Sequence, residues 1–180
     1  MTHIKILAAD IAARILTIFC LGLLTPTVAS AESLAETLNQ WGLIGTTAKD
    51  CAKPASPSNA YRSYIVRADG SVYNAPNSGR GNDSLNSFEV EAATIEPNGA
   101  IVLRETRSDK TVKTLGAAQI VGPAGRFTAD PSKPREMTLT KGSDGRIRLM
   151  SNREVGGDYS VRDGKLVTNG AETPWYTSCK

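Results

Sequence analysis

Histidine is almost missing from this 180-residue chain, whose single copy is His3. Ser–His–Asp and Cys–His enzymes need an imidazole that titrates near neutral pH, so removal of the first residues by processing excludes both classes. Basic clusters are missing as well, because the 21 Lys and Arg residues are dispersed among 18 Asp and Glu residues. Nucleic-acid binding requires a basic stripe that neutralises phosphates. The sequence therefore predicts no nucleic-acid partner.

Long apolar runs are also absent. The run Ile15–Leu24 has about half of the roughly 20 residues that a membrane-spanning helix needs. Two basic residues precede it, and a proline and the small triplet Ala29-Ser30-Ala31 follow. A basic start, a short apolar segment and an A-x-A site are typical of a secretory signal peptide. We expect residues 1–31 to be cleaved, with 32–180 exported as a single domain to the periplasm or outside the cell, without a stable membrane span.

Cysteine is scarce, with three copies in the whole chain. Loss of the signal peptide removes Cys20 and leaves Cys51 and Cys179, and two cysteines in an exported chain predict one disulfide bond. Bridged cysteines supply neither a thiolate nucleophile nor a zinc site. No pair of carboxylates is arranged for hydrolysis. We therefore predict no enzymatic activity, no catalytic residue, no metal and no cofactor.

One helix is predicted, at the start of the exported domain. In the stretch ESLAETLNQWG, Ser33 and Glu36 have the spacing of a capping box, in which each side chain binds the other residue's free backbone N–H. Gly42 favours the left-handed cap that ends a helix. These signals predict a helix over 34–40.

Strands separated by tight turns are predicted for the rest of the domain. Apolar and polar residues alternate with a period of two, as in FEVEA at 88–92. Asp-Gly or Asn-Gly pairs, which favour hairpin turns, stand at 69–70, 98–99, 144–145, 163–164 and 169–170. The predicted strands, some of which merge, are 43–49, 61–67, 71–75, 85–95, 100–107, 112–121, 136–141, 146–151, 159–162, 165–168 and 174–178. The predicted loops are 52–60, 74–84 and 123–136.

Consecutive hairpins without further helices argue against a parallel βαβ sheet. They predict an all-β fold, an antiparallel up-and-down barrel of about eight strands with one short N-terminal helix. A two-sheet β-sandwich is the alternative. In a closed meander the first and last strands are neighbours, so a barrel also accounts for a bond between Cys51 and Cys179.

The stretch LNQWGLIGTTAKDC resembles the entry to the lipocalin-like (calycin) secreted barrels, which begin with a short helical segment and a G-x-W motif on the first strand. Gly45-Thr46-Thr47 stands in that position, so the glycine matches and the tryptophan does not. Either Trp41 or Trp175 is expected to fill the same space. The resemblance implies a central cavity for a small apolar or amphipathic ligand.

Four residues are candidates for lining such a cavity: Tyr64, Tyr73, Arg104 and Glu105. Arg104 and Glu105 are adjacent, so they face opposite sides of one strand. Either one of them projects inward as a polar anchor in an apolar pocket, or the end of the strand leaves the core and both are exposed. The sequence predicts an exported, non-enzymatic binding module for a small apolar or amphipathic ligand. The alternative is an envelope protein-interaction or enzyme-inhibitor domain that acts through its loops.

Overall fold

A computed structural model describes residues 32–80, 87–107, 120–122, 125–127 and 132–180. The predicted signal peptide lies outside the described residues. The helix is α2 (Leu34–Trp41), and the strands are β1 (Gly45–Ala48), β2 (Tyr61–Val66), β3 (Val72–Asn77), β4 (Phe88–Ile95), β5 (Ile101–Arg107), β6 (Ile120–Gly122), β7 (Gly125–Phe127), β8 (Arg135–Lys141), β9 (Ile147–Glu154), β10 (Tyr159–Arg162), β11 (Lys165–Leu166) and β12 (Trp175–Cys179).

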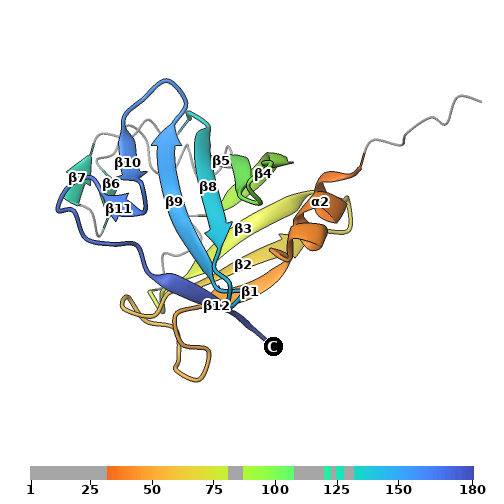
Figure 1. Ribbon diagram of the computed structural model, residues 1–180, viewed down its shortest axis with the longest axis horizontal. Coiled ribbons are helices and arrows are strands. Elements are labelled where there is room, and N and C mark those ends of the chain that lie inside the picture. The colour runs from red at the N-terminus through yellow and green to blue at the C-terminus, as the bar shows by residue number, and fades with distance from the viewer. Residues whose placement is uncertain (1–31, 81–86, 108–119, 123–124, 128–131) are drawn as a thin grey trace, which may run out of the picture. The chain divides into compact units, whose positions relative to one another are not determined.

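Eight of these strands close into an antiparallel barrel (Figure 1). Strands β1, β2, β3, β4, β5, β8 and β9 pair in chain order, and β12 pairs with both β9 and β1 to complete the circle. β9 pairs with β12 at Ile147 and Arg148, and further along with β10 at Asn152 and Arg153. The hairpin of β10 and β11 is therefore an extension beside the barrel. The predicted barrel is confirmed, and the sandwich alternative is wrong.

The helix forms as its sequence predicts. The Glu36 N–H donates to the Ser33 hydroxyl at 3.3 Å, and the Ser33 N–H donates to the Glu36 carboxylate at 2.8 Å, so the capping box is complete. Gly42 ends the helix in the left-handed conformation, with φ of 75°, and its N–H binds carbonyls of the last turn. Only glycine adopts this conformation at little cost.

The helix packs onto the barrel core through Leu38 and Trp41, which are both buried there. The Trp41 indole N–H donates to the Gly99 carbonyl oxygen at 2.8 Å, in the turn between β4 and β5. The Lys141 ammonium, at the end of β8, donates to the Trp41 carbonyl oxygen. Trp175 lies instead in β12 and is only partly buried. Of the two candidates, Trp41 is the one that closes this end of the barrel.

We expect Trp41→Phe to lower the free energy of unfolding by about 1–2 kcal/mol, because it removes the bond to Gly99 and shrinks a buried ring. Trp175→Phe is the matched control. Its ring lies 5.7 Å from the Arg146 guanidinium and 5.6 Å from that of Arg148, and we expect a cost under about 1 kcal/mol for this partly exposed site. Urea unfolding followed by circular dichroism measures both. Equal losses for the two variants would contradict the role of Trp41.

Burial inside the barrel follows the period-two alternation of the strands. The core contains apolar side chains from α2, from the segment before β1, and from the inward positions of β2, β3, β4, β5, β8 and β9. Its buried members are Leu38, Trp41, Leu43, Tyr64, Val72, Val90, Ile101, Leu103, Met137, Leu139 and Ile147. The apolar faces of the predicted hairpins thus point into the barrel and form its core.

The two cysteines lie at disulfide-bonding distance, as the sequence predicts. Their sulfur atoms are 2.01 Å apart and their Cα atoms 5.5 Å apart. Cys179 is the last residue of β12, which pairs with β1, and Cys51 follows β1 after two intervening residues. Closure of the barrel makes these distant parts of the chain neighbours.

Two loop predictions need correction. β3 continues to Asn77, two residues beyond the predicted strand 71–75 and into the predicted loop 74–84, whose Gly, Asn and Ser content favours a loop. Pro76 is tolerated because this part of β3 pairs with β2 and not with β4, and proline is accommodated at such edge positions. Residues 81–84 of the same predicted loop are outside the described part of the chain.

The predicted loop 123–136 contains β7, which pairs with β6, and the first residues of β8. Residues 120–122 agree with the end of the predicted strand 112–121, of which 112–119 lie outside the described residues. The segment 52–60 is a loop with one isolated bridge between Ser56 and Asn59. In the part of the chain that the structure describes, no helix has the length and apolarity to cross a membrane.

Candidate functional site: a buried polar cluster between two cavities

Two of the four candidate residues lie on the outer face of the barrel. The Tyr73 hydroxyl donates to the Glu89 carboxylate at 2.8 Å, and the Arg67 guanidinium lies 3.2 Å from the centre of the Tyr73 ring. Arg104 forms an ion pair of 3.0 Å with Glu91, and both side chains are well exposed. Neither Tyr73 nor Arg104 lines the cavities described below. These two residues hold cross-strand contacts on the surface.

Glu105 points into the barrel and has no exposed surface. Its Oε2 accepts two hydrogen bonds from the Arg135 guanidinium, at 2.5 and 2.9 Å, and its Oε1 accepts one from the Asn74 amide at 2.8 Å. A buried carboxylate persists only when it is paired and hydrogen-bonded in this way. Of the two adjacent charges in β5, Glu105 is therefore the inward one, and the strand does not leave the core.

Tyr64 and Arg62 extend this arrangement along β2. The Asn74 amide also donates to the Tyr64 hydroxyl, at 3.2 Å. Burial, with a smaller effect from Glu105, raises the pKa of the Tyr64 hydroxyl. Burial works to lower the pKa of the Arg62 guanidinium, but Tyr64 and Glu105 raise it, and the net direction is upward. We call Arg62, Tyr64, Asn74, Glu105 and Arg135 the polar cluster.

A cavity of about 360 Å³ lies on one side of the polar cluster, and we call it the apolar cavity. Arg62 and Tyr64 form part of its wall. Most of the remaining wall consists of inward apolar side chains of β8 and β9, with contributions from the first and last strands, the β10–β11 hairpin and the 57–60 loop. These residues are Leu43, Thr47, Lys49, Pro57, Ser58, Ala60, Met137, Leu139, Ile147, Leu149, Val161, Leu166, Thr173, Pro174 and Tyr176.

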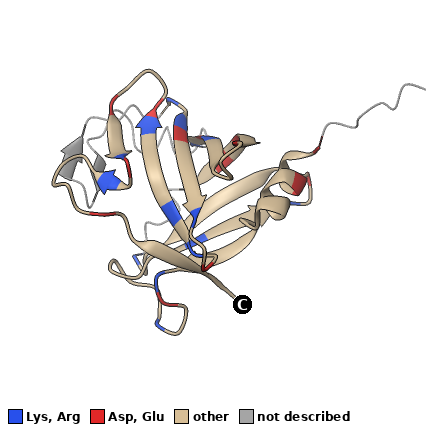
Figure 2. Ribbon diagram, viewed as in Figure 1, with Lys and Arg blue, Asp and Glu red and all other residues tan. Residues whose placement is uncertain are grey.

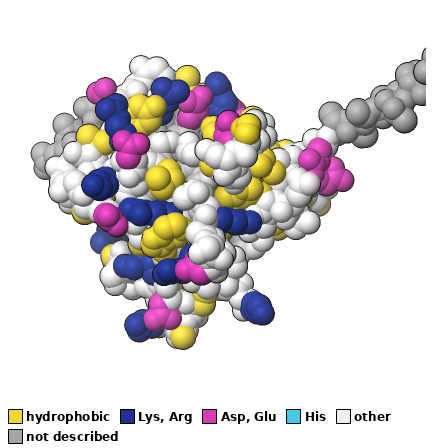
Figure 3. Space-filling view, in the orientation of Figure 1, with side chains coloured by type: hydrophobic (Ala, Val, Ile, Leu, Met, Phe, Trp, Pro, Cys, Tyr) yellow, Lys and Arg dark blue, Asp and Glu magenta, His cyan; other side chains and the backbone are white. Residues whose placement is uncertain are grey.

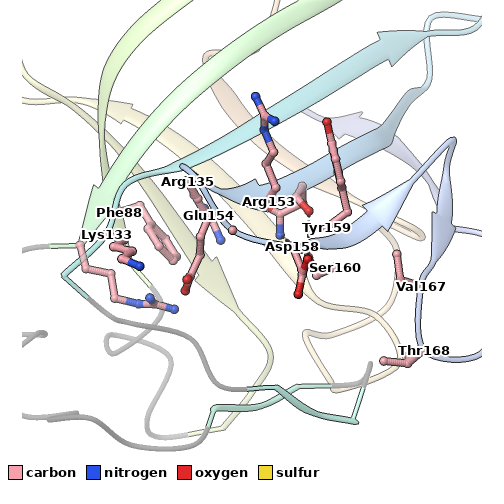
Figure 4. A pocket seen from close by; sticks show the side chains of 13 residues that line it. Phe88, Lys133, Arg135, Arg153, Glu154, Asp158, Tyr159, Ser160, Val167 and Thr168 are labelled. Atoms are coloured by element: carbon pink, nitrogen blue, oxygen red, sulfur yellow. Dashed lines mark hydrogen bonds between the residues drawn. The ribbon is translucent and has the colours of Figure 1, made fainter.

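A second cavity, of about 590 Å³, lies where β4 and β8 begin and where β5 and β9 end, and we call it the mouth cavity (Figure 4). Figure 4 shows Phe88, Lys133, Arg135 and Glu154 gathered at one side of it. The mouth cavity and the apolar cavity share no lining residue. Because Arg62 and Tyr64 line one cavity and Arg135 lines the other, the polar cluster separates the two.

Arg107 is the least satisfied charge at the mouth. Its Nε is buried and has no hydrogen-bond partner in the described part of the chain. Burial, together with the nearby Arg135, lowers the pKa of the Arg107 guanidinium to about 10. Its guanidinium carbon lies 4.5 Å from the centre of the Phe88 ring, and that of Arg135 lies 3.3 Å from the same centre. This aromatic ring therefore supports two crowded cations.

Charge on the outside of the domain is mixed. Figure 2 places basic and acidic residues together where β8 begins and β9 ends, and Figure 3 shows basic side chains dispersed over the face in view. Arg153 and Glu136 form one such pair, at 2.6 Å. Among the described residues, no three His, Cys, Asp or Glu side chains gather closely enough to hold a metal ion.

Three members of the polar cluster were not among the residues singled out from the sequence. Arg62 and Asn74 each carry a usable signal, because each stands two residues from an inward position, Tyr64 or Val72, on its own strand. Arg135 carries none, since it stands in a stretch with three prolines that predicts a loop. A carboxylate that faces inward on one strand requires a cation from another strand, and the sequence alone does not identify the residue that supplies this cation.

No protein-family model matches the chain, and neither the curated proteins nor the solved structures include a match to it. The class of the domain is therefore defined by its fold, a closed eight-stranded antiparallel barrel with a short N-terminal helix packed on its core.

Proposed function

We propose that the chain is an exported, non-enzymatic binding protein of the lipocalin-like type, which holds a small apolar or amphipathic ligand inside its barrel. The observation that carries this proposal is the apolar cavity. Its volume of about 360 Å³ falls within the roughly 300–1,000 Å³ of small-molecule sites. Interiors of small barrels that serve only as scaffolds are filled by their own side chains.

The composition of the wall supports the same function. Small-molecule sites are mostly apolar and contain a few polar groups that orient the ligand. Met137, Leu139 and Leu149 supply the apolar surface, and Arg62 and Tyr64 supply polar groups on one wall. The bonding distance between the two cysteines supports export, because disulfides persist in oxidising compartments.

The test is binding of a neutral apolar fluorophore, N-phenyl-1-naphthylamine, to the exported protein with its cysteines bridged, together with native mass spectrometry for retained molecules. Leu149→Trp enlarges a side chain that lines the cavity, and we expect it to weaken binding by about ten-fold or more, as overfilling a packed site costs 1–3 kcal/mol. Ile65→Trp, on the exposed outer face of β2, is the control and should leave binding unchanged.

Equal binding by Leu149→Trp and Ile65→Trp would contradict the proposed location of the site. Absence of any bound molecule and of any fluorophore binding would overturn the proposed function. That result would favour recognition of a protein through the surface loops instead.

A further inference from the structure

The wall of the barrel is least continuous where β9 meets β12. Among the described residues, β12 pairs with β9 at two positions only, through Trp175 and Tyr176, whereas β8 pairs with β9 from one end of β9 to the other. Pro174 stands before these two residues and has no N–H with which to extend the ladder. Further along, β9 pairs with β10 instead. The sheet therefore divides at residues 149–151 of β9, and we call this place the fork (Figure 1).

Residues 159–174 lie across the fork, and we call them the flap. They comprise β10, β11 and the residues that lead to β12. Four of them line the apolar cavity, namely Val161, Leu166, Thr173 and Pro174. In the part of the chain that the structure describes, the only ladder between the flap and the barrel is the short one of β10 with β9, which a register shift interrupts. One wall of the cavity is thus held mainly by other contacts.

Arg148 of β9 supplies several of these contacts. Its guanidinium donates to the Gly164 carbonyl oxygen at 2.9 Å and to the Thr173 hydroxyl oxygen at 3.2 Å. It also forms an ion pair of 3.2 Å with Glu172. A Cβ added at Gly164 would lie 3.1 Å from the guanidinium, so glycine permits this close approach. The Arg148 side chain is 16% exposed and does not line the apolar cavity.

Two direct hydrogen bonds also cross the fork. The Gly164 N–H donates to the Met150 carbonyl oxygen at 2.8 Å. The Thr173 hydroxyl donates to the Leu149 carbonyl oxygen at 2.7 Å. Separation of the flap from β9, beyond its β10 end, breaks these bonds and those of the guanidinium, but it leaves the ladders of β9 with β8 and of β12 with β1 intact. Segments held by few bonds open locally at a lower free energy than the whole domain unfolds.

We propose that the flap is a gate through which the ligand passes between β9 and β12 into the apolar cavity, and that Arg148 is the latch that holds it closed. In the open state residues 163–174 have left β9, while β10 and β12 stay paired. This inference rests on the proposed function and specifies how the ligand reaches its site. Arg148 is a positioning residue, because it acts on the flap and not on the ligand. A weaker latch raises the rate constants of association and dissociation by the same factor and leaves the affinity nearly unchanged.

Stopped-flow fluorescence with N-phenyl-1-naphthylamine measures both rate constants. We expect Arg148→Met to raise each of them by about ten-fold, the effect of losing hydrogen bonds to a charged group, and to change Kd by less than about three-fold.

Arg146→Met is the matched control. The Arg146 guanidinium also lies beside the Trp175 ring, 5.7 Å from its centre, but it pairs with exposed Asp144 and not with the flap. This variant should leave both rate constants unchanged. Equal acceleration by the two variants, or faster dissociation without faster association in Arg148→Met, would overturn the gate.

Hydrogen exchange followed by NMR tests the opening without a ligand. The Gly164 and Thr173 amides, whose hydrogen bonds hold the flap, should exchange at least about ten-fold faster than those of the β8–β9 ladder, and faster still in Arg148→Met. If the fluorophore binds but these amides exchange only with global unfolding, or Arg148→Met changes neither rate constant, the gate is wrong and the proposed function stands. If the fluorophore does not bind wild-type protein, the proposed function fails. If Arg148→Met does not fold, exchange in the wild-type protein decides.

Discussion

Replacing Glu105 with glutamine is expected to lower the free energy of unfolding of the barrel by about 3–5 kcal/mol, the usual cost of removing one partner of a buried ion pair. The carboxylate has no exposed surface, and it is the acid that neutralises Arg135, whose side chain is 16% exposed. Without it, a guanidinium inside the barrel is left with a neutral amide for a partner. The Asn74 amide also exchanges a charged acceptor for a neutral one.

Two further variants make this expectation specific. Glu91→Gln removes the acid of an exposed pair with Arg104 and should cost less than about 1 kcal/mol, because surface ion pairs are well solvated. The double variant Glu105→Met/Arg135→Met removes both buried charges, and we expect it to be more stable than Glu105→Gln, since replacing a whole buried pair by apolar groups is often neutral. Urea unfolding measures all three. A loss for Glu105→Gln no larger than that for Glu91→Gln would contradict a buried pair.

Loss of the bond between Cys51 and Cys179 is expected to reduce stability by about 4–5 kcal/mol in the chain-entropy model of cross-linking. The two residues are 128 positions apart, so the bond closes a loop of nearly the whole domain. It restricts the unfolded chain strongly, and it also fastens β12 beside β1, where the barrel closes. The variant Cys51→Ser/Cys179→Ser and the reduced wild-type protein should unfold at similar, lower urea concentrations.

The serine variant also provides the control for the reductant. Adding dithiothreitol should shift the unfolding midpoint of the wild-type protein and leave that of the variant unchanged. Mass analysis after alkylation without reduction should find neither thiol modified in the wild-type protein. Two alkylated thiols, or a midpoint that does not respond to the reductant, would show that no bond stabilises the domain.

Much of the fold was predicted because its signals are local. The capping box of Ser33 and Glu36 requires only four consecutive residues, and Asp-Gly or Asn-Gly pairs dictate tight turns through backbone conformation alone. Alternation in FEVEA assigns Phe88, Val90 and Ala92 to one face of β4. Phe88 and Val90 are buried, but a register shift between Val90 and Ala92 leaves Ala92 exposed. The less accurate boundaries occur where the tertiary structure permits a strand that the local composition does not predict. Pro76 lies inside β3, and it is tolerated there because this part of β3 pairs with β2 and not with β4.

The site was predicted only in part, because its contacts are not local. Among the four candidates, Tyr64 and Glu105 face inward, while Tyr73 and Arg104 face outward. Alternation along a strand shows which of its residues share a face. Which of the two faces points into the barrel depends on how the whole sheet curves. The pairing of Glu105 with Arg135 joins β5 to β8 across a segment that local patterns assign to a loop.

The sequence by itself determined the helix, most strands, the turn positions and the pair of cysteines, because each depends on neighbours along the chain or on a simple count. Only the tertiary structure decided that the sheet closes, that Trp41 rather than Trp175 packs into its core, and that one carboxylate is enclosed with Arg62 and Arg135 around it. Closure brings strands together that are far apart in the chain, and the electrostatic balance of the interior exists only once they meet.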